Sequence, residues 1–289
     1  MKPLTLATYN IHKGLSPLNR KLVIHDVREK LHALDADIVF LQEVQGGHAK
    51  NEARFEDWPE LSQHEHIAEG RYHDIVYGVN AQNQHSDHGN AILSAYPVVN
   101  WTNRDVSHHR FEARGHLLAR IDVPGWDVPL TCVCVHLGLF QQSRTMQIDK
   151  LTEFLAHSAP GDAPLVVAGD FNDWRSKRGG ISTALKRDLG LREVFEETQG
   201  KPAKTFPAIF PMLTLDRIYV RGVNIEEVLR LHGAIDGVKW RGLSDHIGLA
   251  VRLTRDGQTI PLKEPREPRP VAATETTPRA SVSTPRVSK

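Results

Sequence analysis

The chain has 289 residues, of which 40% are hydrophobic and 25% are charged, and its formal net charge is +1. This composition is typical of a soluble globular protein of one large or two small domains. No run approaches the roughly 18 apolar residues of a transmembrane helix, and the N-terminus has no apolar run of signal-peptide length, so we expect a cytoplasmic protein without a transmembrane segment.

The first half of the chain alternates strands with few helices. Ile24, Val27, Leu31 and Leu34 recur at helical spacing and predict an amphipathic helix over residues 21–36. The region 46–71 is polar and is predicted to be irregular with one short helix. Strands are predicted at residues 4–11, 37–41, 73–79 and 90–95, the last two separated by a polar loop over residues 80–89.

The second half continues in the same way. Helices are predicted at residues 144–156 and 180–189, and strands at residues 116–123, 128–135, 165–169, 215–220 and 247–253. These are too many strands and too few helices for a doubly wound parallel sheet. Two packed sheets with helices on their outer faces fit the pattern better.

The end of the chain differs in composition from the rest. Residues 255–289 carry seven Lys or Arg and four Asp or Glu, so their net charge is +3. Because the whole chain has a net charge of +1, residues 1–254 have a net charge of about −2. The segment is rich in Pro, Thr, Ser and Arg and shows no periodicity, so we predict one folded domain, residues 1–254, and a disordered tail, residues 255–289. The acidic domain lacks the strong basic footprint of a non-specific duplex binder.

A buried strand leads into the most informative stretch. Four apolar residues, 165–168, are followed by Gly169, Asp170, Phe171 and Asn172. In an extended backbone Asp170 and Asn172 point to the same side, so a carboxylate and a carboxamide would project together at the strand end. They could bind a hard cation or hold a water, but Gly, Asp and Asn also suit an ordinary turn. This stretch alone leaves both interpretations open.

Polar side chains occur at several other strand ends. They are Asn10, Glu43, His136, Asp216 and the run Ser244, Asp245 and His246. Each alone has an ordinary structural explanation, such as a helix cap or a surface ion pair. Buried together without a task they would cost desolvation energy. Carboxylates and amides suit Mg²⁺, and histidines can give hydrogen bonds or protons to a phosphate.

Seven short motifs in sequence order carry a family resemblance. They are Tyr9-Asn10-Ile11, Leu41-Gln42-Glu43, Gly89-Asn90-Ala91-Ile92-Leu93-Ser94, His136-Leu137, Gly169-Asp170-Phe171-Asn172, Leu215-Asp216-Arg217-Ile218 and Ser244-Asp245-His246. The set resembles the motifs of the endonuclease/exonuclease/phosphatase superfamily, which includes deoxyribonucleases, apurinic endonucleases, inositol polyphosphate phosphatases and neutral sphingomyelinases. The resemblance covers roughly residues 4–253. It implies an α+β fold, a four-layer αββα sandwich of two packed, mostly antiparallel sheets with helices on the outer faces.

The resemblance also implies a metal site. Glu43 matches the principal metal ligand of the family, with Asn10 beside it in the metal and phosphate shell and Asp245 as a further acidic residue close to the metal. The implied cofactor is Mg²⁺, with Mn²⁺ as the alternative.

The other matched residues have implied roles in hydrolysis of a phosphate ester by a metal-dependent enzyme. Asp170 matches the carboxylate that positions or deprotonates the attacking water, and Asn172 the amide that orients it. His136 matches a histidine that binds the scissile phosphate. His246 matches the second catalytic histidine, and Asp216 the carboxylate that holds its ring. The general base is either Asp170, which we favour, or the Asp216–His246 pair.

Two further residues are candidates for binding the substrate phosphate. Arg114 precedes a predicted strand in an Arg-Gly step that is similar to one in the bacterial and sphingomyelinase-like branches, and Asn90 lies in the third motif. For Arg114, a surface arginine at a strand start is an equally good explanation. We expect the histidines of residues 84–88 to be solvated.

The sequence leaves the substrate open. Our first hypothesis is a phosphodiesterase acting on nucleic acid; the alternative is a hydrolase of phospholipid head groups or of a small phosphorylated metabolite, and the least favoured is a non-catalytic binding protein. We expect no hydrophobic hairpin for membrane docking and no obligate protein partner.

Overall fold

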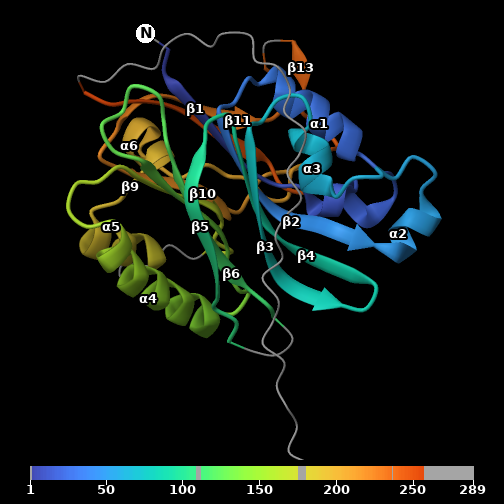
Figure 1. Ribbon diagram of the computed structural model, residues 1–289, viewed down its shortest axis with the longest axis horizontal. Helices are drawn as coiled ribbons and strands as arrows, with labels where there is room; N and C mark the ends of the chain where they lie inside the picture. Colours follow the sequence, from blue (N-terminus) through green and yellow to red (C-terminus); the bar gives the residue numbers. More distant parts are fainter. Residues whose placement is uncertain (1, 109–111, 175–179, 236, 257–289) are drawn as a thin grey trace, which may run out of the picture.

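Two six-stranded β-sheets face each other in a computed structural model, which describes residues 2–108, 112–174, 180–235 and 237–256 (Figure 1). Helices cover the outer face of each sheet. The first sheet has the strand order β11 (Asn224–Leu231), β14 (Gly248–Thr254), β1 (Leu4–Asn10), β2 (Ile38–His48), β4 (Ser86–Ser94) and β3 (Asp74–Asn83).

The second sheet has the strand order β5 (Val98–Asp105), β6 (Gly115–Ile121), β7 (Leu130–His136), β8 (Leu165–Asp170), β10 (Asp216–Arg221) and β9 (Arg192–Glu193). A small separate sheet pairs β12 (Ala234–Ile235) with β13 (Val238–Lys239). Within the large sheets β1 pairs with β2 and β7 with β8 in parallel, and the other strand pairs are antiparallel. The predicted mostly antiparallel architecture is confirmed.

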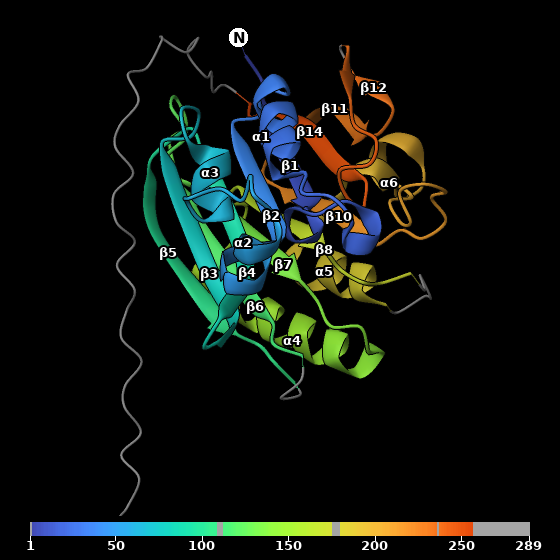
Figure 2. The same cartoon turned by 90° about the vertical axis from the view of Figure 1, so that its right-hand side faces the viewer.

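The helices form the outer layers. Helices α1 (Ile24–Ala33) and α3 (Gln63–Ala68) lie on the first sheet, and α4 (Gln141–Ser158) and α5 (Ile181–Leu189) on the second (Figures 1 and 2). The remaining helical elements are short: η1 (His12–Gly14), η2 (Pro17–Asn19), α2 (Ala49–Arg54) and α6 (Val194–Gln199).

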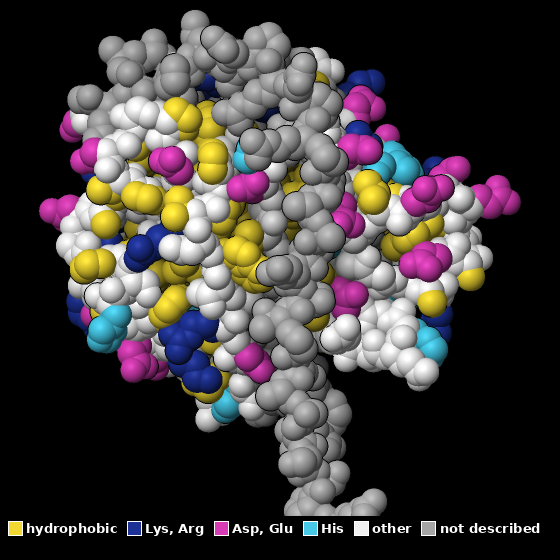
Figure 3. Space-filling view, viewed as in Figure 1, with side chains coloured by type: hydrophobic (Ala, Val, Ile, Leu, Met, Phe, Trp, Pro, Cys, Tyr) yellow, Lys and Arg dark blue, Asp and Glu magenta, His cyan; other side chains and the backbone are white. Residues whose placement is uncertain are grey.

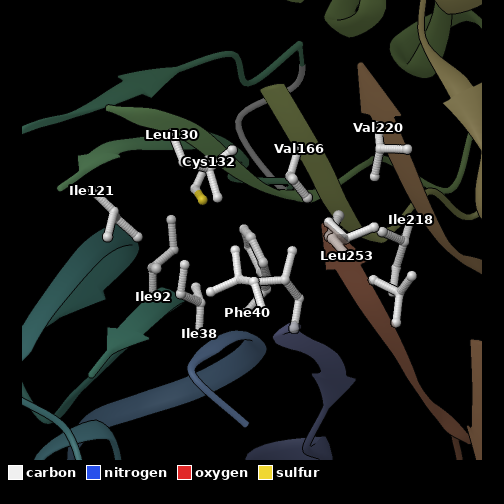
Figure 4. Close-up of a cluster of buried hydrophobic side chains, with 14 of the residues drawn as sticks. Ile38, Phe40, Ile92, Ile121, Leu130, Cys132, Val166, Ile218, Val220 and Leu253 are labelled. Atoms are coloured by element: carbon white, nitrogen blue, oxygen red, sulfur yellow. The ribbon is translucent and has the colours of Figure 1, made fainter. Parts of the chain in front are cut away.

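Three apolar layers explain why the buried strands are apolar at successive positions. Phe40 and Val166 point into the layer between the sheets (Figure 4), whereas their neighbours Leu41 and Val167 point outward, under α1 and α4 respectively. Because side chains alternate along a strand, a strand buried on both faces needs apolar residues throughout. The run at residues 165–168 is such a strand, covered by the other sheet on one face and by helices on the other.

The structure corrects the predicted loop over residues 80–89. Strands β3 and β4 extend through it and form a hairpin whose turn is residues 84–85. Oδ1 of Asn83 accepts hydrogen bonds from the backbone N–H groups of His85 and Ser86, which closes the turn. These strand ends are polar because they extend beyond the hydrophobic core. They are strands because they pair with each other through backbone hydrogen bonds, which the composition does not reveal.

A second correction concerns exposed apolar residues. Residues 205–215 form a tight turn with exposed Ile209, Phe210 and Met212, contrary to the expectation that the chain has no hydrophobic hairpin. Among the described residues no helix combines the length and apolar character needed to cross a bilayer. The predicted tail lies outside the described residues from position 257 onward.

Candidate active site

Strand register places three of the expected residues side by side in the second sheet. Asp170, at the end of β8, pairs with Asp216 at the start of antiparallel β10 and with His136 at the end of parallel β7. The parallel pairing brings two strand ends to one edge, and the antiparallel pairing adds a strand start. These ends and the loops that continue from them lie in the right-hand half of Figure 2.

Asn10 connects the two sheets at this edge. Its side-chain Nδ2 lies 3.2 Å from Oε1 of Glu43, in its own sheet, and 3.2 Å from Oδ2 of Asp170, in the other sheet. Asn10 is fully buried, and its charge-assisted hydrogen bond to Asp170 is buried too, whereas the one to Glu43 is partly exposed. The amide thereby fixes the separation between the Glu43 side and the Asp170 side of the site.

Asp170 is buried at the centre of the cluster. Its Oδ1 accepts a 2.9 Å hydrogen bond from the backbone N–H of Asn172, and its Oδ2 lies 3.6 Å from Nε2 of His136 and 3.8 Å from Nε2 of His246. Burial raises the pKa of the Asp170 carboxyl and outweighs the opposing effect of the His246 charge. The group is therefore a stronger base than an exposed aspartate.

His246 is held between two carboxylates. Its Nδ1 lies 2.8 Å from Oδ2 of Asp216, and the ring of Phe206 lies 5.0 Å away, centroid to centroid. Burial lowers the pKa of His246, but the charges of Asp216 and Asp170 outweigh burial and raise this pKa to about 10. His246 is thus an imidazolium at neutral pH.

His136 has the opposite electrostatics. Burial, followed by the positive charge of Arg114, lowers the pKa of His136 to about 3. The two histidines therefore differ in charge at neutral pH although both contact Asp170. A neutral His136 can still donate one hydrogen bond to a phosphate oxygen.

Glu43 lies in a bulge of β2 with a left-handed backbone, φ 57°. Such a conformation is uncommon for a residue other than glycine and is concentrated at functional sites. The bulge turns the carboxylate toward Asn10, while Lys13 Nζ lies 4.0 Å from Oε2. Burial acts to raise the pKa of Glu43, but His136, Lys13 and the Asn10 hydrogen bond outweigh it and lower this pKa, so Glu43 is ionised.

The donor set on this side fits a hard divalent cation. Glu43 supplies carboxylate oxygens and Asn10 an amide oxygen, and Asp245 is linked to Glu43 through His12, whose Nδ1 lies 3.2 Å from Asp245 Oδ1 and 4.0 Å from Glu43 Oε2. Oxygen ligands on partly exposed carboxylates are what Mg²⁺ prefers.

A second cluster could also hold a metal ion by distance alone. Donor atoms of Asp170, Asp216 and His246 lie within 4.8 Å of one another. However, Nδ1 of His246 is hydrogen-bonded to Asp216, so a proton occupies the position between them. We interpret this cluster as an acid–base group, which leaves the Glu43 side as the candidate metal site.

Asn172 and Arg114 are fixed by backbone carbonyls. Asn172, with φ 50°, donates from Nδ2 to the carbonyl of Leu137 at 3.0 Å, and Arg114 donates from Nε to the same carbonyl at 3.2 Å. Asn90 is fully buried and donates to the carbonyl of Gly115, next to Arg114. The structure thus brings Asn172 and Arg114 to the edge near His136. Asn90 is connected to this edge only indirectly, through Gly115 beside Arg114.

Three site neighbours were not expected from the sequence. His12 and Lys13 lie on η1, just after Asn10, and both have left-handed φ angles of 46° and 61°. His88 is half-buried, contrary to the expectation that it is solvated, and its pKa is lowered by burial and then by Arg114 and Lys13. The sequence could have suggested His12 and Lys13 as site residues, because they follow directly after the strand that ends at Asn10.

Comparison with known proteins agrees with this geometry. Residues 7–246 match the Endonuclease/Exonuclease/phosphatase family. The chain belongs to this family. It is a metal-dependent phosphoric ester hydrolase of α+β sandwich architecture, as the seven motifs predicted.

Relatives include the Escherichia coli K12 protein YbhP, which is 41% identical over 246 residues, 85% of this chain and 94% of YbhP. An endonuclease/exonuclease/phosphatase of Beutenbergia cavernae has a similar fold, with a TM-score of 0.68, 18% identity, and coverage of 89% of this chain and 73% of that one.

Two further solved structures of similar fold differ in what their names describe, a DNA product in one and a sugar phosphatase in the other. TDP2 of D. rerio in complex with a single-strand DNA product has a TM-score of 0.62 and 16% identity, covering 87% of this chain and 98% of that one. A mannosyl-6-phosphatase of Bacteroides thetaiotaomicron has a TM-score of 0.63 and 15% identity, covering 87% and 99%. The shared fold therefore does not select a substrate.

Proposed function

We propose that this chain is a Mg²⁺-dependent phosphodiesterase in which Asp170 activates the attacking water. The observation that carries the proposal is the buried carboxylate of Asp170, held by Asn10 and Asn172 between two histidines. In the reaction, the water oxygen forms a bond to phosphorus, the bond to the leaving oxygen breaks, and the water proton passes to Asp170.

The charge of His246 supports Asp170 as the base. An imidazolium cannot accept a proton, so the Asp216–His246 pair is unsuited to deprotonate water at neutral pH. Its positive charge instead stabilises negative charge that develops on the phosphate, and neutral His136 donates a hydrogen bond to a phosphate oxygen. When bound, Mg²⁺ would neutralise part of the charge on the phosphate and on the leaving oxygen.

Glu43, Asn10 and Asp245 would hold the metal, and Arg114 would contact a phosphate oxygen. Glu43 is ionised, and Lys13 and His12 lie beside its carboxylate and that of Asp245. The Lys13 ammonium partly neutralises the site before a metal binds. Mn²⁺ would fit the same oxygen donors.

The sequence ranked nucleic acid first among substrate classes, and the fold also occurs in a DNA-bound structure and in a sugar phosphatase. On the face seen in Figure 3, basic side chains occur as separate groups among acidic and apolar ones rather than as a continuous stripe.

A substrate panel with a metal-site variant tests the proposal. Purified protein with Mg²⁺ is assayed on plasmid, single-stranded DNA, RNA, phospholipid, inositol phosphates and a chromogenic phosphodiester, with Glu43→Ala alongside. We expect hydrolysis of at least the chromogenic diester, loss on chelation, and a fall of about 10²-fold or more in Glu43→Ala. Full activity in Glu43→Ala, or inactivity of the wild type on every substrate, would contradict it.

A further inference from the structure

A short hairpin of neutral residues stands beside the candidate active site. The backbone N–H of Thr205 donates to the carbonyl of Leu213 at 2.8 Å, and those of Met212 and Leu213 donate to the carbonyl of Phe206 at 2.9 and 2.8 Å. These bonds close residues 205–213 into a tight turn. No charged residue occurs between positions 205 and 215.

This hairpin is tied directly to the catalytic segment. The backbone N–H of Ala208 donates to the carbonyl of Asp245 at 2.7 Å, and that of Ile247 donates to the carbonyl of Thr205 at 2.8 Å. The Phe206 ring packs on His246. The hairpin tip therefore has a fixed position relative to the phosphate-binding residues.

The tip is strongly apolar and exposed. The relative exposures of Ile209, Phe210 and Met212 are 85%, 69% and 55%. Large apolar side chains gathered at a surface and rigidly presented mark interaction sites.

Two more loops that leave the site add apolar residues of the same kind. Leu139 and Phe140 follow His136 with exposures of 55% and 65%, and Trp174 follows Asn172. We refer to these six side chains as the apolar rim: Leu139, Phe140, Trp174, Ile209, Phe210 and Met212.

We propose that the apolar rim seats the active site on a lipid surface, so that its substrate is an amphiphilic phosphodiester whose non-polar part stays in that surface. This inference rests on the proposed phosphodiesterase function. The aliphatic and aromatic side chains of the rim would be buried among the lipid chains, while the phosphate of the substrate reaches Asp170.

The composition of the rim favours lipid over nucleic acid. Nucleic-acid grooves combine accessible cations with stacking rings. Three of the six rim side chains are aliphatic or thioether, and the loops 137–142 and 205–215 contain no Lys or Arg. The guanidinium of Arg144, which lies 5.2 Å from the centroid of the Trp174 ring, is buried. Arg175, Lys177 and Arg178 follow Trp174 in the sequence and lie outside the described residues. The test must therefore vary lipid charge and salt.

The experiment compares two double variants of the full chain. Ile209→Asp with Phe210→Asp places charges on the rim. Val99→Asp with Trp101→Asp places them on exposed positions of β5, at the end of the second sheet away from Asp170. Each protein is sedimented with vesicles of phosphatidylcholine, with and without phosphatidylglycerol, at low and high salt. The rate on vesicle phospholipid is divided by the rate on a soluble chromogenic phosphodiester.

We expect the wild type to bind both vesicle types with binding that survives high salt. The rim variant should lose about a hundredfold of vesicle binding and of the rate ratio, since each of its two buried side chains contributes about tenfold. The β5 variant should keep both. Absence of wild-type vesicle binding, equal losses in both variants, or loss of single-stranded DNA binding in the rim variant alone would overturn the inference. Inactivity on the soluble diester would instead refute the proposed function, while vesicle binding could still be measured.

Discussion

Nδ1 of His246 lies 2.8 Å from Oδ2 of Asp216, and Nε2 of the same ring lies 3.8 Å from Oδ2 of Asp170. The ring is buried between two carboxylates, so its positive charge is favoured although burial alone would oppose it. This arrangement divides the roles: Asp170 remains available as a base, and the Asp216–His246 pair supplies a fixed cation.

Replacing Asp216 with Asn should separate those roles. The amide can still hydrogen-bond to His246, but without the Asp216 charge the pKa of His246 falls from about 10, and the alkaline limb of the activity profile moves to lower pH. We expect turnover to drop by about 10²-fold near neutral pH. The pH dependence of kcat and an NMR titration of the His246 ring measure both effects. An unchanged alkaline limb would show that Asp216 does not set the charge of His246.

Gly169 is required by the approach of the neighbouring strand. Its φ is 145°, and an added Cβ would lie 1.9 Å from the carbonyl oxygen of Val135 in β7. We therefore expect Gly169→Ala to cost about 3 kcal/mol of unfolding free energy and to displace Asp170, lowering kcat. Thermal unfolding and turnover are the measurements.

Gly161 offers the matched control for this substitution. It also has a positive φ, 62°, but an added Cβ would meet nothing within 4 Å. Gly161→Ala should cost only about 1 kcal/mol and leave turnover unchanged. Equal costs at the two positions would mean that backbone conformation, rather than the contact with β7, determines the requirement for glycine at 169.

Acid should destabilise the fold through buried neutral histidines. Burial, then the charges of Arg104 and Lys150, lower the pKa of His116 from 6.5 to about 3. Between pH 3 and pH 6.5 His116 is protonated in the unfolded chain but neutral in the folded protein. The free energy of unfolding therefore decreases as the pH falls from 6.5 toward 3.

For one such group the loss is up to about 1.4 kcal/mol per pH unit. Urea midpoints should fall between pH 7 and pH 5, and the fall should be smaller in His116→Gln. The same slope in both proteins would contradict the assignment.

The sequence predicted most of the site because its residues lie at the ends of strongly apolar strands. Asn10, Asp170 and Asp216 follow or begin such strands, and strand register alone then brings Asp170 next to Asp216. Two packed sheets with outer helices were predictable because the chain has many strands and few intervening helices, and the family resemblance implied the αββα sandwich.

What the sequence did not predict depends on tertiary contacts. Strand β11 is largely exposed and rich in charge, and its pairing with β14 rather than its composition makes it a strand. The bulge that turns Glu43 toward Asn10, and the left-handed His12 beside Asp245, are backbone conformations without a signature in their residue types. The apolar hairpin was missed because the sequence does not show whether Ile209 and Phe210 are buried or exposed.

The most direct test of the account is single-turnover hydrolysis of a chromogenic phosphodiester by Asp170→Asn with saturating Mg²⁺. Asp188→Asn serves as control, since Asp188 is ion-paired with Arg187 on the surface of α5, away from the site. We predict that Asp170→Asn lowers the chemical rate by about 10³-fold or more and leaves the substrate Kd within about twofold, because the carboxylate takes a proton from water rather than binding the substrate. A near-normal chemical rate in Asp170→Asn would contradict the central claim.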